Sequence, residues 1–131
     1  PTAGPRIAQT APDEAASQER PFDGASWRAR VEGKTLYYET RKGYPENYGL
    51  MGKEYYVPNS NKVVFVYADG DCYEGTWDYA DQIFCFNYDD RHCFRQFERD
   101  GEWIVQERDG REQAVVKITS EVLSCQPGLV S

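Results

Sequence analysis

Short runs of aromatic and β-branched residues alternate with turn residues along the second half of the chain. The dipeptide Asp-Gly occurs between these runs three times, at Asp69-Gly70, Asp100-Gly101 and Asp109-Gly110. Asp-Gly accepts the positive φ angles of a two-residue type I′ turn, which is typical of a tight β-hairpin. The pattern therefore predicts an antiparallel meander of about eight strands.

The turns also predict which side chains share a face, because successive side chains of a strand point to opposite sides. Two-residue turns at Asp69-Gly70 and at Ala80-Asp81 place Trp77 opposite Phe84 and bring the aromatic residues of this region to one face. That face collects Val64, Val66, Tyr73, Trp77, Phe84, Phe86 and Tyr88. A three-residue turn at 88–90 adds Phe94, and the two later Asp-Gly turns add Trp103, Val105, Ala114, Val116 and Ile118.

The chain before the meander predicts one short helix within residues 22–33. Asp23 or Ser26 can cap its first turn, and the glycine that closes this range can end it. Trp27 and Val31 lie four residues apart and therefore share one side of the helix.

An apolar face that extends over eight strands has to be covered or closed on itself. The predicted helix is too short to cover a flat sheet, so we expect a strongly curled sheet or a small calycin-like barrel plugged by that helix. The predicted fold class is all-β with one short N-terminal helix. Two interiors are compatible with this fold, a solid aromatic core and a cavity that holds a ligand.

The amino-acid composition of the chain changes near residue 21. Residues 1–20 contain no aromatic residue and are rich in Ala, Pro, Gln and Thr, so they bury too little apolar area to offset the entropy of ordering. We expect a flexible N-terminal tail over 1–20 and a single disulfide-bonded β domain over 21–131. No apolar run approaches the roughly 18 residues of a membrane span, so none is expected.

The chain has four cysteines, and no two of them have the Cys-x-x-Cys spacing: Cys72, Cys85, Cys93 and Cys125. An even number in a small chain favours two disulfides formed in an oxidising compartment, periplasmic or extracellular. A three-residue turn at 88–90 would place Cys85 opposite Cys93, which leaves Cys72 to pair with Cys125. Four reduced cysteines in a cytosolic core are the alternative.

Charge limits the classes of partner. The formal net charge of −7 argues against nucleic acid, which requires clustered Lys and Arg. We expect another protein as partner, or else a small apolar ligand.

Little in the sequence indicates catalysis. His92 is the only histidine, it adjoins a cysteine predicted to form a disulfide, and no Gly-x-Ser-x-Gly motif occurs. Asp89, Asp90 and His92 could approach a metal at a hairpin tip, but charged tips usually keep a turn solvated. No catalytic residue, cofactor or metal site is predicted.

Six tyrosines within 20 residues form the leading candidate for a binding surface. They are Tyr37, Tyr38, Tyr44, Tyr48, Tyr55 and Tyr56, with glycines between them. Tyrosine and glycine together are typical of recognition loops, since tyrosine offers a large contact area at low entropic cost. The alternative is that these tyrosines pack at the rim of the sheet.

Three short motifs carry a family resemblance: Gly33-Lys34-Thr35-Leu36-Tyr37, Gly75-Thr76-Trp77 and Phe84-Cys85-Phe86. Over residues 23–125 the chain resembles small exported alphaproteobacterial proteins of unknown function, in which a short helix precedes a Gly-Lys-Thr strand and a Gly-x-Trp strand. The resemblance implies export and a β-rich domain, and it supplies no catalytic residue. Gly-x-Trp is also similar to a motif of lipocalin-like barrels, although there it lies near the start of the barrel.

These observations together predict a non-enzymatic exported binding domain, acting as a protein-interaction or accessory subunit of a periplasmic or cell-surface assembly. A lipocalin-like carrier of a small apolar ligand is one alternative. A protease inhibitor that uses the N-terminal tail is the other.

Overall fold

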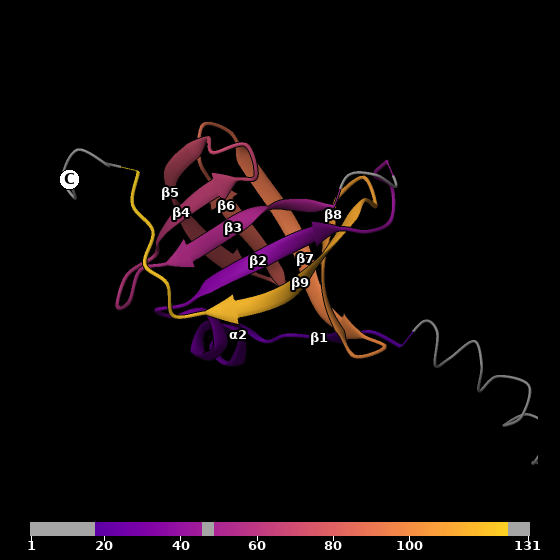
Figure 1. Ribbon diagram of the computed structural model, residues 1–131. Helices are drawn as coiled ribbons and strands as arrows, with labels where there is room; N and C mark the ends of the chain where they lie inside the picture. Colours follow the sequence, from indigo (N-terminus) through magenta and orange to yellow (C-terminus); the bar gives the residue numbers. More distant parts are fainter. Residues whose placement is uncertain (1–17, 46–48, 126–131) are drawn as a thin grey trace, which may run out of the picture.

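The computed structural model describes residues 18–45 and 49–125. It contains one helix and nine strands (Figure 1). In chain order these elements are β1 (Arg20–Pro21), α2 (Gly24–Val31), β2 (Thr35–Thr40), β3 (Leu50–Tyr56), β4 (Lys62–Tyr67), β5 (Cys72–Ala80), β6 (Ile83–Asn87), β7 (Arg91–Arg99), β8 (Glu102–Glu107) and β9 (Glu112–Thr119).

Strands β2 to β9 form a closed antiparallel barrel. Each strand pairs with the next along the chain, and β9 returns to pair with β2. β1 adds two residues to β7, with Arg20 opposite Glu98. The predicted all-β, calycin-like barrel with one short helix is confirmed. Arg20, which was expected in the tail, is the first residue of β1, and residues 1–17 lie outside the described part.

The turn at Asp100-Gly101 has the predicted length. Both residues have positive φ, 54° and 81°, and Arg99 pairs directly with Glu102. Trp103 therefore enters the barrel on the predicted face, together with Val105 and Phe94.

The turn at Asp69-Gly70 is one residue longer than predicted. The Tyr67 amide donates to the Asp71 carbonyl at 2.8 Å, and of Asp69 and Gly70 only the glycine has positive φ, 101°. A three-residue loop with glycine at its left-handed position is the next most common hairpin connection. The extra residue reverses the faces of β4. Val63 and Phe65 point into the barrel, whereas Val64 and Val66 point outward, so the prediction for the latter two was wrong.

The turn at Asp109-Gly110 shows the same change. The Glu107 amide donates to the Arg111 carbonyl at 2.8 Å across a three-residue loop. The faces of β9 are consequently reversed, and three residues predicted on the inner aromatic face do not lie on it. Ala114 packs in a second small cluster with Phe97 and Ile104 on the other face, while Val116 and Ile118 are exposed.

The turn between β5 and β6 is formed by Asp81 and Gln82, with φ of 53° and 67°, rather than by Ala80 and Asp81. Trp77 therefore lies opposite Phe86 instead of Phe84. A shift of two residues preserves the side-chain faces, so these aromatic residues still point inward as predicted.

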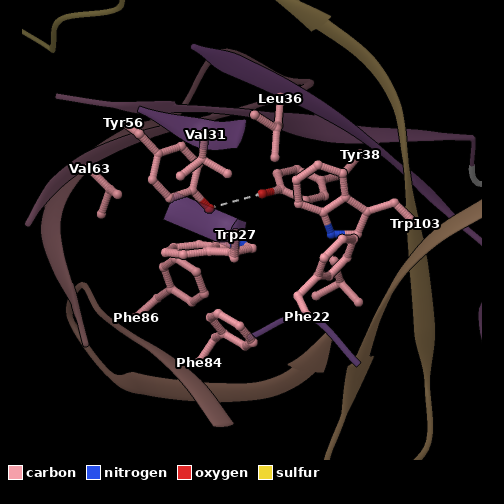
Figure 2. Close-up of a cluster of buried hydrophobic side chains, with 11 residues drawn as sticks. Phe22, Trp27, Val31, Leu36, Tyr38, Tyr56, Val63, Phe84, Phe86 and Trp103 are labelled. Carbon is pink, nitrogen blue, oxygen red and sulfur yellow. Dashed lines mark hydrogen bonds between the residues drawn. The ribbon is translucent and has the colours of Figure 1, made fainter. Parts of the chain in front are cut away.

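Helix α2 closes one end of the barrel (Figure 1). The Asp23 side chain accepts a hydrogen bond from the Ser26 amide at 2.8 Å, which identifies Asp23 as the cap, and Gly33 follows the helix with φ of 74°. Trp27 is fully buried and Val31 nearly so, on the one side of the helix that the sequence predicted them to share. Figure 2 shows Trp27 at the centre of the surrounding rings. The centroid of its ring also lies 4.9 Å from that of Trp77.

The cysteines form the two predicted pairs. Cys85 lies directly opposite Cys93 on β6 and β7, and Cys72 at the start of β5 pairs with Cys125. The second bond fixes residues 120–125, which we call the C-terminal strap, across the outside of β2 and β3. Within the strap the Glu121 carbonyl accepts from Thr35 Oγ1 at 2.6 Å.

Candidate functional site

A cavity of about 440 Å³ occupies the half of the barrel opposite the helix. It is bordered by four connections, β2–β3, β4–β5, β6–β7 and β8–β9, which all lie at the end away from the helix. Eight aromatic residues line it: Tyr38, Tyr44, Phe65, Tyr67, Tyr73, Phe86, Tyr88 and Phe94. Of the two interiors left open by the sequence, the helix end has the packed aromatic core and the other end has the cavity.

The strand period explains how these rings reach one space. Phe65 and Tyr67 are two residues apart on β4, and Phe86 and Tyr88 are two apart at the end of β6, so each pair points inward. Glycine at position 75 leaves room for Tyr88. A Cβ there would lie 2.2 Å from the Asn87 carbonyl oxygen and 2.7 Å from the Tyr88 ring.

A buried carboxylate, Glu54, lies among the residues that line the cavity and is only 4% exposed. Its Oε1 accepts from the Tyr56 hydroxyl at 2.7 Å and from the Tyr38 hydroxyl at 2.9 Å. Its Oε2 accepts from the Tyr88 hydroxyl. The two hydroxyls on Oε1 are 3.3 Å apart (Figure 2). Donors from β2, β3 and the end of β6 thus hold the carboxylate in one position.

The electrostatics of this cluster keep the tyrosines as donors. Burial raises the pKa of the Glu54 carboxyl, and the three hydroxyl hydrogen bonds act in the opposite direction. Burial and the neighbouring Glu54 charge together raise the pKa of Tyr38, Tyr56 and Tyr88 well above that of a free tyrosine. The hydroxyls therefore remain protonated at neutral pH.

One acceptor position of Glu54 is left over. A carboxylate offers about four lone-pair positions, and hydroxyls of the described chain fill three of them. The remaining position belongs to Oε2, which accepts only from Tyr88. Within the described residues, no second hydrogen-bond donor lies on this oxygen.

A second polar cluster lies at the mouth of the cavity. The Tyr44 hydroxyl donates to Glu107 and accepts from Gln113 Nε2 at 3.3 Å. The Arg111 guanidinium lies 5.1 Å from the centre of the Tyr44 ring and 3.0 Å from Glu107 Oε1. Burial, followed by the hydrogen bond to Glu107, raises the pKa of Tyr44 to about 12. These contacts hold the β2–β3 connection against the β8–β9 turn.

The charge of the lining is negative. Four carboxylates, Glu54, Asp89, Asp90 and Glu107, line the cavity, and Arg111 is the one Lys or Arg among the described lining residues. If all are ionised, four negative charges and one positive charge leave a formal charge of −3 around this space. Arg111 is also paired with Asp109 at 2.9 Å, which further reduces its effect inside.

Three of the six tyrosines predicted to form a binding surface are buried. Tyr38, Tyr55 and Tyr56 are 4%, 7% and 1% exposed, because the strands that carry them pack inward or beneath other chain segments, so their expected exposure was wrong. Tyr37 is partly buried on the outside of the barrel, where its hydroxyl donates to Glu121 at 2.6 Å. Tyr44 is at the cavity mouth, and Tyr48 lies outside the described residues.

Sequence reasoning missed Glu54. Glu54 lies two positions before Tyr56 on β3, so the two side chains share a face, and this spacing was the available indication. An acid inside a barrel is tolerated only when donors surround it, and Tyr38 and Tyr88 come from strands distant in the sequence.

The hairpin tip with Asp89, Asp90 and His92 borders the same cavity. Within residues 18–45 and 49–125, no group of three or more His, Cys, Asp or Glu side chains could hold a metal ion. No helix in the described chain is long and apolar enough to cross a membrane.

Comparison with known proteins gives no match: no family model matches the chain, and neither does any curated protein or any solved structure. The cavity itself is therefore the feature that indicates a function.

Proposed function

We propose that this protein is a binding protein for a small molecule that occupies the barrel cavity. The observation that carries the proposal is a space of about 440 Å³ lined by eight aromatic rings and bordered by connections at one end of the barrel. Small-molecule sites are typically concave, mostly apolar and about 300–1,000 Å³ in volume. The few polar groups at Glu54 and Tyr44 would orient the ligand, while the apolar walls supply most of the contact.

Blocking the cavity tests the proposal. Met51 lines the cavity and is partly buried, so Met51→Trp would fill part of it. The preceding residue, Leu50, is 43% exposed, and Leu50→Trp adds the same side chain outside the barrel as a matched control. The probe is N-phenyl-1-naphthylamine, a neutral apolar fluorophore, titrated into each protein.

We expect saturable binding at one site in the unmodified protein and in Leu50→Trp, with binding lost or weakened at least tenfold in Met51→Trp. Equal binding by the two variants would place the probe outside the cavity. No saturable binding by the unmodified protein would contradict the proposal.

An exported location is part of the proposal. Two cysteine pairs at disulfide distance support it, because structural disulfides persist in oxidising compartments. The protein-interaction role stays a prediction with reduced support, since three of its six tyrosines are buried. The inhibitor role would use the tail, most of which is outside the described residues.

A further inference from the structure

We infer that the ligand of this cavity is a small organic cation, a protonated amine attached to an aromatic or other apolar group. The inference rests on the proposed function and names its ligand class. It places the ammonium group at Glu54 and the apolar group among the surrounding rings.

The charge of the lining selects against anions. Carboxylates outnumber guanidinium groups four to one among the described lining residues. Arg111, the one candidate for binding an anion, is already paired with Glu107 and Asp109 at 3.0 and 2.9 Å. A concave site lined mainly by one sign of charge concentrates ligands of the opposite sign, and low-dielectric walls strengthen this effect.

Glu54 is the group suited to bind the ammonium. Three hydroxyls fix its two oxygens, one from Tyr38 on β2, one from Tyr56 on β3 and one from Tyr88 at the end of β6. The free acceptor position on Oε2 fits one N–H donor, and a charged donor makes the stronger hydrogen bond. A carboxylate ligand would instead meet Glu54 at close range and be repelled.

The aromatic walls suit the same ligand. Phe65, Phe86 and Phe94 offer ring surface without a competing polar group, and Tyr88 joins them beside the carboxylate. Aromatic rings attract cations through their negative faces, which is how aromatic cages bind ammonium ligands. They also bury the apolar part of an amine. An apolar ligand without a donor would leave the last acceptor position of Glu54 unfilled.

Three indoles that differ in one group provide the test: tryptamine is a cation, tryptophol is neutral and indole-3-propionate is an anion. Each is used to displace N-phenyl-1-naphthylamine from the unmodified protein at pH 7 and low salt. We expect tryptamine to bind at least about tenfold more tightly than tryptophol, and indole-3-propionate to bind most weakly. This ranking uses the unmodified protein and does not depend on the folding of a variant.

The Glu54→Gln variant tests whether Glu54 is the source of the preference for tryptamine over tryptophol. The substitution keeps the shape and removes the charge, so tryptamine should weaken about tenfold while tryptophol changes little. Glu74→Gln removes the same charge from an exposed position on β5 and should leave both affinities unchanged.

The outcomes separate the two proposals. If the fluorophore binds but tryptamine is not preferred, the cationic ligand is refuted while the binding cavity stands. If the preference survives in Glu54→Gln, Glu54 is not its source. If the fluorophore itself does not bind, the proposed function fails.

Discussion

Gln96 links the helix to the barrel through a single oxygen, and its removal gives the sharpest test of the packing. Gln96 Oε1 accepts from the indole N–H of Trp27 at 3.1 Å and from that of Trp103 at 2.8 Å. The three side chains are 3%, 0% and 7% exposed. Gln96→Leu therefore leaves two buried donors without their acceptor.

The cost follows from the number of donors. An unsatisfied buried donor costs about 1–3 kcal/mol, so two donors predict that Gln96→Leu lowers the free energy of unfolding by about 2–6 kcal/mol. Urea unfolding followed by circular dichroism measures this change, with the slope of the transition checked for two-state behaviour.

A double-mutant cycle isolates the hydrogen bond from changes in shape. Trp103→Phe removes one indole N–H, and its packing cost should be similar whether Gln96 or Leu occupies position 96. We expect the two substitutions together to destabilise by about 1 kcal/mol less than the sum of their separate effects. A coupling near zero, or a Gln96→Leu variant as stable as the unmodified protein, would refute the reasoning.

Three further predictions concern the cavity, the strap and the barrel wall. Tryptamine affinity should fall on acidification as Glu54 gains a proton. Because burial raises the Glu54 pKa, the fall should begin at a higher pH than for an exposed glutamate, and calorimetric titrations at several pH values measure it. Replacing Cys72 and Cys125 by serine should lower stability by about 4 kcal/mol, since the bond spans 53 residues, as urea unfolding will show. Gly75→Ala should destabilise by about 1–3 kcal/mol because a Cβ there meets the backbone of the facing chain, whereas Gly49→Ala, with open space around it, should be nearly neutral in thermal unfolding.

The pH prediction has a defined sign and a control. Ionised Glu54 attracts the ammonium and protonated Glu54 does not, so affinity is retained above its pKa and lost below it. Asp89, Asp90, Glu107 and His92 are further ionisable side chains that line the cavity, and Glu54→Gln retains all four. An acid-induced loss of equal size in Glu54→Gln would attribute the effect to those groups instead.

The sequence predicted the barrel better than its registers, and the Asp-Gly turns show why. At Asp100-Gly101 both residues have positive φ, whereas at Asp69-Gly70 only the glycine does. The dipeptide satisfies both geometries, because a two-residue turn and a three-residue turn each place glycine in the left-handed region. Local sequence therefore predicts that a hairpin exists there without fixing its length.

Strand β4 could not correct that ambiguity. Its residues 63–67 are all apolar, so no alternation of polar and apolar positions identifies the inner face. Val64 is itself 6% exposed although it points away from the barrel interior. Burial on both faces removes the pattern from which a face can be predicted.

The cavity could not be predicted from local sequence patterns, for a different reason. Its polar centre joins Glu54 to Tyr38 and Tyr88, residues up to 50 positions apart that meet only when the barrel closes. The sequence placed several tyrosines together and suggested recognition, but the direction in which each one points depends on the registers. The two disulfides were easier to predict from the sequence. The pairing of Cys85 with Cys93 depends on one short hairpin, and it leaves the other two cysteines as a pair.

The C-terminal strap also determines how the barrel responds to mechanical force. A pull on the chain beyond Cys125 is transmitted through the disulfide to Cys72 at the start of β5, so the load bypasses β9. In the reduced protein the same pull would break the contacts of Glu121 with β2 and β3 and then peel β9 from its neighbours one hydrogen bond at a time. The disulfide thus protects the last strand against a pull from this end of the chain.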